Sequence, residues 1–417
     1  MSQFNVQRNA VNADQIYYDV VVSNFQSTTT IPPIFYFNEQ RTLPFITNPE
    51  DYYLSILRFT METGTLPVLI PSCAPLSPTV DTTIYSVCLN WTDIATTTLY
   101  TSGQVFIEWR PQDKSAIVPP APAVAQNGVQ DITTGYYNCY SYAYWCYLVT
   151  EALATAYNQL NVAVVAGGSV LPSAYPPLFN WDASAQSAFL LADRAGYSTN
   201  NGLVVNPSCI QIYFNAPLFN LFNSFPSVYL GYVGVTDGRN NLLSVIDIGG
   251  SNFQIITPDY LTPLITYTAL PVYQEYSTIS AWTPIVSIVF TSNTLPIQPS
   301  QVSTPLVYNN DQKVVLGGNN SAISNVITDL VSDSGNYRPN LVYNPTAQYR
   351  LTTLYGNRPL YNLDLQIFYK LKTGQLVPFR LGSGEVVSVK IAFLKKDLYA
   401  NQTLTDPFSK FTPINTK

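Results

Sequence analysis

Side chains that could support catalysis or bind a metal are sparse in this 417-residue chain, which contains no histidine. Histidine is the usual general acid or base near neutral pH and the commonest metal ligand. Its absence excludes Ser-His-Asp and Cys-His triads, the HExxH zinc motif and His-ligated haem. The chain has 31 Tyr, 31 Pro and only 2 Met. This composition favours a protein selected for packing and surface contacts rather than for chemistry.

The cysteines are the next candidate ligands or nucleophiles. Their number is odd, no CxxC occurs and no histidine can complete a zinc site. The five are Cys73, Cys88, Cys139, Cys146 and Cys209. Cys139 and Cys146 lie seven residues apart, about two helical turns, so we expect them on one face of a helix. We interpret all five as small buried hydrophobic residues of a protein kept in a reducing compartment.

Oxygen ligands and paired carboxylates give two weaker signals. The segment Asp247–Asn252 (DIGGSN) could supply oxygen ligands to a cation, but it has one carboxylate and is more typical of a turn. A glycosidase needs two carboxylates across a cleft, and the sequence cannot pair its candidates. These candidates are Glu39, Glu50, Asp51, Glu108 and Asp113.

Nucleotide and sugar sites are no better supported. No GxxxxGK[ST], GxGxxG or GxSxG motif occurs. Tyrosines and a tryptophan between 136 and 147 could stack on a sugar or a partner, but their helical spacing favours an aromatic core. We therefore assign no catalytic, cofactor-binding or metal-binding residue, and we expect no cofactor.

Charge is scarce along the whole chain. Charged residues make up 11% of it, against about 25% in a typical globular domain, and hydrophobic residues make up 47%. The formal net charge is −6, and the densest basic cluster is Lys395-Lys396 near Lys390, which disfavours direct binding of nucleic acid. No apolar run is long enough to span a bilayer, and the polar segment Met1–Asn9 lacks a signal-peptide core. A surface so poor in charge favours burial against copies or partners, so we expect a homo-oligomer.

Hydrophobic patterning predicts many short strands and few helices. Ile16, Tyr18, Val20 and Val22 share one face of a half-buried strand. Further strands are predicted at 52–60, 83–89, 104–109, 210–214, 228–235, 253–256 and 282–291, with a hairpin at 179–191. Helices are predicted at 138–160, 217–226 and 321–331, the first being the longest.

The C-terminal part alternates most clearly. Strands at 362–371, 376–381 and 387–393 are separated by short turns, which predicts a three-stranded meander. Val389 and Ile391 lie on its inward face, so we expect them in the core.

A change in composition divides the predicted β domain. The segment 111–131 is rich in Pro, Ala and Gln, as linkers are. We expect an N-terminal arm at 1–15, a β domain at 16–110 and 206–400, an inserted mixed subdomain with one longer helix at 111–205, and a tail at 401–417. The many short strands without βα alternation indicate that the β domain is an antiparallel sandwich.

Several of these segments resemble a known group of proteins. Asp51–Phe59 (DYYLSILRF) with Leu66–Pro71 (LPVLIP), Ile210–Asn215 (IQIYFN) through Pro226, and Pro359–Asn362 (PLYN) through Lys396 are similar to penton-like or minor capsid proteins of small eukaryotic DNA viruses, the polinton-like viruses and virophages. The resemblance spans much of the chain and carries no catalytic signature. It implies an antiparallel jelly-roll capsid subunit, assembled inside the host cell and located in the virion.

The same resemblance implies partners. These are other copies, as in a pentamer at a five-fold vertex, and neighbouring capsid proteins such as a major capsid protein. Two other classes stay open from the residues: a fibre- or lectin-like host-attachment protein that binds through 111–205, and an enzyme with paired carboxylates. The sequence does not separate a vertex protein from a minor cement protein or a major shell protein.

Overall fold

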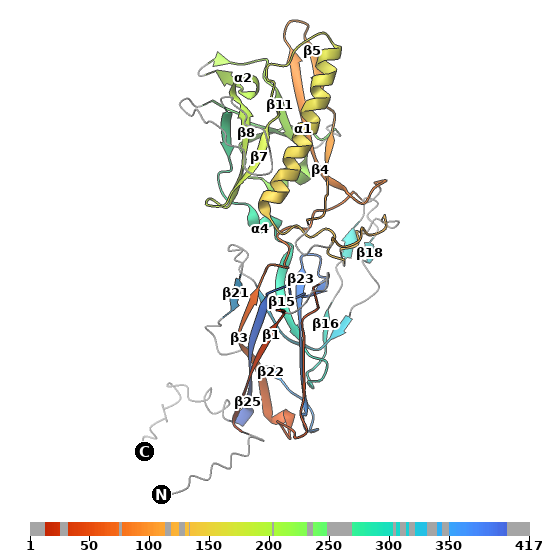
Figure 1. Ribbon diagram of the computed structural model, residues 1–417, viewed down its shortest axis with the longest axis vertical. Helices are drawn as coiled ribbons and strands as arrows, with labels where there is room; N and C mark the ends of the chain where they lie inside the picture. The colour runs from red at the N-terminus through yellow and green to blue at the C-terminus, as the bar shows by residue number, and fades with distance from the viewer. Residues whose placement is uncertain are drawn as a thin grey trace, which may run out of the picture. The chain divides into compact units, whose positions relative to one another are not determined.

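The computed structural model describes residues 13–25, 32–74, 77–112, 118–124, 130–132, 134–201, 204–231, 237–247, 269–302, 306–308, 314–316, 322–331, 340–343 and 350–397. The chain divides into two compact units (Figure 1). Residues 1–66 and 285–417 form the first, which we call the sandwich unit. Residues 67–284 form the second, which we call the inserted unit.

The sandwich unit contains two antiparallel sheets. The first has the strand order β1 (Gln15–Ser23), β25 (Val386–Lys395), β3 (Tyr52–Glu62) and β21 (Asn340–Tyr343), with β22 (Thr352–Thr353) also paired to β3. The second has the order β2 (Tyr36–Gln40), β23 (Asn362–Leu371), β15 (Ile285–Thr291) and β20 (Val326–Val331), with β24 (Leu376–Pro378) also paired to β23. Shorter elements are η1 (Pro49–Asp51) and the paired strands β16 (Ser300–Val302) with β19 (Ala322–Ser324) and β17 (Leu306–Tyr308) with β18 (Val314–Leu316).

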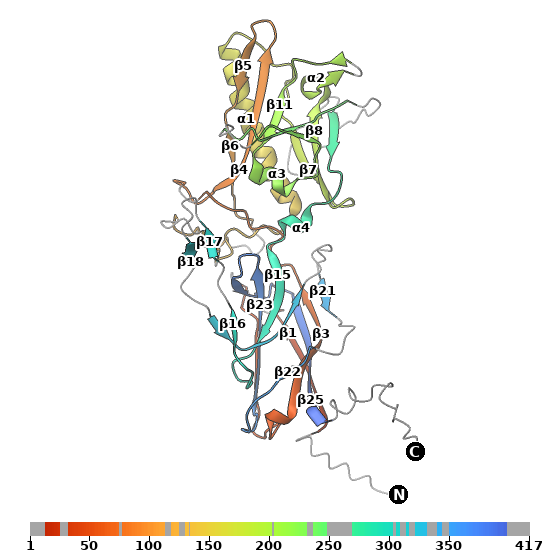
Figure 2. The ribbon, with the colours of Figure 1, turned by 180° about the vertical axis from the view of Figure 1, so that it is seen from behind.

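The strand order defines the topology. Counted along the chain, the eight main strands are ordered first-eighth-third-sixth in one sheet and second-seventh-fourth-fifth in the other. This is the arrangement of a jelly roll, in which two Greek keys close over one core. Figure 2 shows β23 and β15 side by side, as their antiparallel pairing requires. The predicted antiparallel jelly-roll sandwich is therefore confirmed.

The core of the sandwich comes from alternate residues of facing strands. Val387, Val389, Ile391 and Phe393 of β25 are fully buried. On β23, the inward side chains of Leu363, Leu365, Ile367 and Tyr369 are buried as well. The predicted burial of Val389 and Ile391 is confirmed.

The predicted C-terminal meander is wrong in its pairing. β24 pairs with β23, but β25 pairs with β1 and β3 in the opposite sheet. The turn before β25 causes this crossing: Gly384, at φ 81°, donates its N–H to the carbonyl of Asn24 beyond the end of β1, and Asn24 N–H donates to Glu385 O. Strands that are neighbours in sequence thus lie in different sheets.

The predicted helix at 321–331 is also wrong, because this segment forms β19 and β20. Ile327 and Leu330 are both buried at a spacing of three, which imitates a helical stripe. A register shift between Phe290 and Thr291, where β15 pairs with β20, interrupts the strand alternation. The β-branched residues of β20 favour an extended backbone.

The inserted unit contains a six-stranded sheet, a three-stranded sheet and a long helix. The larger sheet has the order β12 (Ser227–Tyr229), β13 (Asn241–Leu243), β11 (Gln211–Phe214), β4 (Thr82–Asp93) and β5 (Thr98–Thr101), with β6 (Val105–Glu108) paired to β4. The smaller has the order β14 (Ala269–Tyr273), β8 (Ser187–Asp193) and β7 (Leu178–Asp182), which includes the hairpin predicted at 179–191. The remaining elements are β9 (Asn200–Asn201), β10 (Val204–Val205), α2 (Arg194–Tyr197), α3 (Ala216–Leu221), α4 (Ile279–Trp282) and α1 (Tyr142–Ala166).

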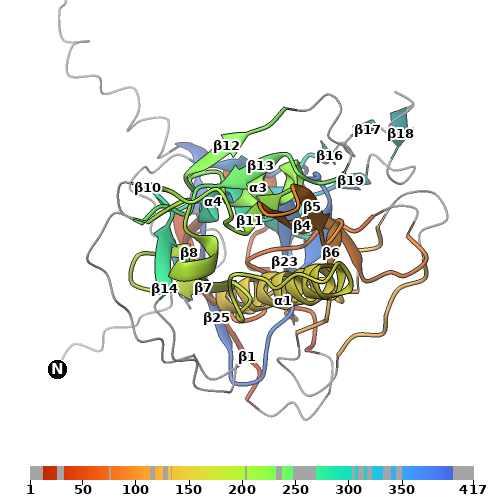
Figure 3. The same ribbon diagram turned by 90° about the horizontal axis from the view of Figure 1, so that it is seen from above.

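Helix α1 organises this unit. Figure 3 shows it running past β7 and β6. The hydroxyl of Ser141 caps it by accepting from Tyr144 N–H. Thr150 Oγ1 donates to Phe179 O of β7 and accepts from Phe179 N–H, both at 2.8 Å. The helix begins four residues after the predicted start, because Cys139 is held in an extended bridge to Leu69.

The unit boundaries differ from those expected from composition. The inserted unit spans 67–284 rather than 111–205. The reason is that β4, β5 and β6, expected in the β domain, pack on α1, while β4 also pairs with β11. Most of the expected N-terminal arm, the tail at 401–417 and the strand predicted at 253–256 lie outside the described residues.

Candidate assembly surface

The outward face of the sheet β1-β25-β3-β21 exposes apolar side chains. Along β1, Tyr18 and Val20 point into the core, while Tyr17 and Val21 point outward with exposed fractions of 52% and 62%. On β21 the side chain of Val342 is 65% exposed. The sequence signal for this face was present, because apolar residues occupy both alternating sets of positions in β1.

Charges on this face compensate one another. Asp19, Lys390 and Arg58 are aligned across three neighbouring strands. Arg58 Nη2 lies 3.4 Å from Asp19 Oδ2, and Lys390 Nζ lies 5.3 Å from the ring centroid of Tyr17. Such exposed pairs add little to folding stability. They do leave a face of mixed polar and apolar character, as protein interfaces have.

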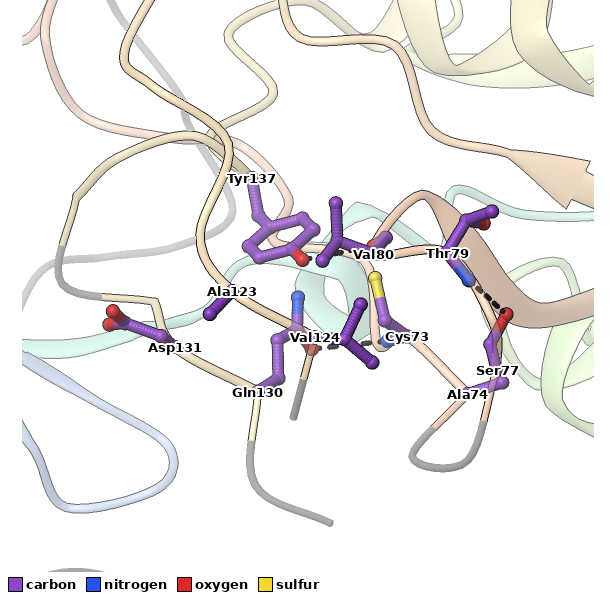
Figure 4. Close-up of a pocket in the computed structure, with 10 residues that line it drawn as sticks. All are labelled: Cys73, Ala74, Ser77, Thr79, Val80, Ala123, Val124, Gln130, Asp131 and Tyr137. Atoms are coloured by element: carbon purple, nitrogen blue, oxygen red, sulfur yellow. Dashed lines mark hydrogen bonds between the residues drawn. The ribbon is translucent and has the colours of Figure 1, made fainter. Parts of the chain in front are cut away.

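A small pocket in the inserted unit is the candidate for ligand binding. Figure 4 shows side chains that line it, including those of Cys73, Val80, Gln130 and Tyr137. Gln130 is fixed by both ends of its amide: Nε2 donates to Pro71 O at 2.9 Å, and Oε1 accepts from Cys73 N–H at 3.1 Å. The enclosed space has room for about one water molecule, which is too little for a substrate.

The groups around this pocket are not activated for chemistry. Burial raises the pKa of the Cys73 thiol to about 12, so the thiol is protonated at neutral pH and is a poor nucleophile. Tyr137 Oη donates to Val80 O at 2.9 Å, and Tyr136 Oη donates to Asp81 Oδ1 at 2.7 Å. Burial also raises the pKa of both tyrosines. These contacts stabilise the fold.

The candidate ligands named from the sequence are used in packing or in ion pairs. Cys88, Cys139, Cys146 and Cys209 are buried, and Cys73 is half-buried. Cys139 precedes α1, so the expected placement of Cys139 and Cys146 on one helix face is wrong. Among the described residues, no three Cys, Asp or Glu side chains lie close enough to hold a metal ion.

Two of the acidic candidates take part in ion pairs. Asp247 Oδ2 lies 2.5 Å from Arg194 Nη2, and the rest of the predicted turn, residues 248–252, lies outside the described part of the chain. Glu39 pairs with Arg41 at 2.7 Å. The aromatic residues Tyr136, Tyr137 and Trp145 are buried, as an aromatic core requires. No helix within the described ranges is long and apolar enough to cross a bilayer.

Solved structures show the same fold. A chain in the 3.5 Å cryo-EM structure of the Sputnik virophage aligns with a TM-score of 0.72 and 27% identity, covering 93% of this chain and 99% of that one. The mavirus penton protein aligns with a TM-score of 0.54 and 13% identity, covering 91% of this chain and 99% of that one. The second likeness concerns the fold alone.

Sequence relatives come from the same virophage. Structural protein V19 of Sputnik is 29% identical over 220 residues, which cover 53% of this chain and 94% of V19. Sputnik protein V18 is 30% identical over 165 residues, which cover 39% of this chain and 95% of V18. The family described as Sputnik minor capsid protein V18/19 matches residues 16–395. The chain is therefore a virion structural protein and belongs to the Sputnik minor capsid protein V18/19 family.

Proposed function

We propose that this capsid protein is a vertex subunit that forms a homopentamer and packs against a second, more abundant capsid protein. The observation that carries the proposal is the jelly-roll topology with one large unit inserted between β3 and β15. A protein of this fold, the mavirus penton protein, bears the name of a vertex component. The low charge content supports burial of much of the surface in contacts with neighbours.

The outward face of β1, β25 and β21 is the surface we assign to these contacts. Tyr17, Val21 and Val342 supply exposed apolar area, and the ion pair of Asp19 with Arg58 is already formed before a neighbour arrives. Burying a compensated pair costs less than burying a lone charge. β1 is also the edge strand of its sheet in the described structure, so a neighbour can approach along the strand as well as over the face.

Native mass spectrometry of the purified chain tests the proposal. The expected result is a species of five copies. Val21→Glu should shift the population to monomer, because it buries an unpaired charge in each contact. Val205→Glu is the matched control: Val205 is 74% exposed on the inserted unit, and this variant should assemble normally.

Two results would contradict the proposal. A stable trimer, or a monomer at every concentration and in the presence of the major capsid protein, rules out a pentameric vertex subunit. If Val21→Glu assembles normally, the outward face of β1, β25 and β21 is not the contact surface, although the proposed pentamer is not contradicted. The host-attachment alternative needs a ligand site on the inserted unit, and the pocket beside Cys73 holds only about one water molecule.

A further inference from the structure

One end of the inserted unit gathers exposed aliphatic side chains. Figure 1 shows β5 beside the C-terminal end of α1. Tyr100 of β5 lies so close to Gly167, just beyond α1, that a side chain at Gly167 would collide with it. Five aliphatic residues at this end, which we call the aliphatic end, have exposed fractions between 52% and 81%. They are Ile94, Leu99, Val162, Val165 and Val170.

The two segments that form the aliphatic end lack charge. No Asp, Glu, Lys or Arg occurs between 94 and 107 or between 152 and 181. The solvent-facing stripe of α1 changes along its length: Thr155 and Asn158 are polar, whereas Val162 and Val165 in the last turns are apolar. A solvated helix face normally carries charged residues, so the loss of polarity is local to this end.

The backbone at the aliphatic end already has its hydrogen bonds. The carbonyls of Ala163, Val164 and Val165, which an ordinary helix end leaves to water, accept from the N–H groups of Gly167, Ser169 and Gly168 at 3.0–3.1 Å. Burying these carbonyls under another surface therefore costs little desolvation free energy.

The nearest carboxylate at this end is also satisfied. Asp93 Oδ2 accepts from Ser169 Oγ at 2.6 Å, and Asp93 Oδ1 accepts from Ala95 N–H at 2.9 Å. These bonds join the β4–β5 turn to the segment after α1. They fix the two aliphatic segments relative to one another before any partner binds.

We propose that the aliphatic end is a contact between inserted units of neighbouring copies of this chain. The charge distribution selects this occupant. The chain carries a net charge of −6, so contact between two copies is least opposed by local repulsion where charge is absent, and this end is such a place. A second copy brings the same uncharged aliphatic surface, so contact between the two surfaces removes water from no charged group. An anionic lipid surface fits less well, because the aliphatic end offers no Lys, Arg or exposed Trp.

The size of the aliphatic end defines its role. Five side chains are fewer than the roughly 20–30 residues that each partner contributes to a stable interface. The contact therefore forms between copies that other surfaces already hold together, where the effective concentration is high. In this respect the inference rests on the proposed homo-oligomer.

Thiol protection tests this contact in the full-length chain. In Val165→Cys the new thiol lies in the aliphatic end, and in Thr155→Cys, the matched control, it lies on the same exposed stripe about 15 Å along α1. Each variant is alkylated with iodoacetamide under dilute and under assembling conditions. The wild-type chain gives the background from the native cysteines. We expect alkylation of Val165→Cys to slow about tenfold on assembly and that of Thr155→Cys to stay unchanged.

A double variant gives a second readout. In Val162→Asn with Val165→Asn the aliphatic area is removed without adding charge. We expect the concentration of half-assembly to rise about tenfold, and Thr155→Asn to leave it unchanged.

The outcomes separate the two proposals. If native mass spectrometry shows the oligomer but both thiols react equally fast in it, the aliphatic end is not a copy–copy contact and the proposed function stands. If no oligomer forms and neither thiol is protected, both proposals are wrong. If only Val165→Cys is protected, and only when phosphatidylcholine vesicles are added, the partner is a lipid surface and the inference is overturned.

Discussion

The carboxylate of Asp364 on β23 accepts a 2.7 Å hydrogen bond from the hydroxyl of Thr294, just beyond the end of β15. The N–H groups of Asn293 and Thr294 donate to the same carboxylate at 2.9 Å, as does Ser292 Oγ at 2.5 Å. Asp364 is fully buried. A single ionised side chain thus holds the turn that follows a central strand of the jelly roll.

Removing that carboxylate should destabilise the sandwich unit. In Asp364→Ala several buried donors lose their acceptor, and we expect the free energy of unfolding to fall by roughly 2–4 kcal/mol. Urea unfolding followed by far-UV circular dichroism measures the change, because all five tryptophans lie in the inserted unit and do not report on the sandwich unit. Asp19→Ala serves as the control, because Asp19 is 53% exposed in a surface pair and its loss should cost less than about 0.5 kcal/mol. Equal effects of the two substitutions would contradict this role for Asp364.

Acid should remove the same stabilisation. Burial alone raises the pKa of Asp364, but hydrogen bonds from Ser292, Thr294 and Asn293 outweigh it and hold the pKa below its ordinary value. Because the folded-state pKa is lowered, the stabilisation is complete above the unfolded-state pKa of about 3.9 and is lost as the pH falls through the folded-state pKa. The difference in unfolding free energy between the wild-type chain and Asp364→Asn should therefore shrink between about pH 6 and about pH 2. A constant difference would show that the carboxylate does not titrate in this way.

The last strand should be sensitive to truncation of its inward side chains. Ile391 is fully buried between the sheets, so Ile391→Ala should cost roughly 2–5 kcal/mol. Val342→Ala, at a site 65% exposed, should cost less than about 0.5 kcal/mol in the isolated chain. The denaturant midpoints of both variants measure these costs. A small loss of unfolding free energy in Ile391→Ala would contradict the buried position of β25.

The cysteines should be nearly unreactive in the folded chain. Burial raises the pKa of Cys73 to about 12 and also raises the pKa of Cys88, Cys139, Cys146 and Cys209. Labelling with a disulfide reagent at about pH 8 should therefore be slow in buffer, and all 5 thiols should react in denaturant. Rapid labelling of one thiol in buffer would contradict this prediction, because it requires an accessible thiolate in the folded chain.

Local patterns predicted many of the strands and the long helix, but not how the strands pair. The alternation in 387–393 identified an inward face correctly, since burial on one side of a strand leaves a period of two. It could not reveal that β25 crosses to β1 and β3, because that choice depends on the contact between Gly384 and Asn24, which are distant in sequence. At 321–331 the bulge beside Phe290 changed the spacing of buried residues to three and imitated a helix.

For the candidate site, too, composition supported general predictions, whereas the unit boundaries depend on contacts between distant residues. Scarcity of charge predicts association between copies, which stays a prediction, and the absence of histidine excludes the classes of chemistry that depend on it. The boundary expected at 111 was misplaced because the Pro-rich stretch lies within the inserted unit, between β6 and α1. Deleting 111–205 removes α1 from β4 and β6, which α1 packs against, so we expect such a deletion to cause misfolding.

The insertion between β3 and β15 also constrains the order of events on the ribosome. Every strand with which β1, β2 and β3 pair in the described structure is encoded after residue 339: β21, β22, β23 and β25. The inserted unit is continuous in sequence and can fold as soon as Pro284 has emerged. The first three jelly-roll strands must wait, unpaired, until almost the whole chain has been translated. A truncated nascent chain therefore cannot present a finished jelly roll, and only complete subunits can enter a growing shell.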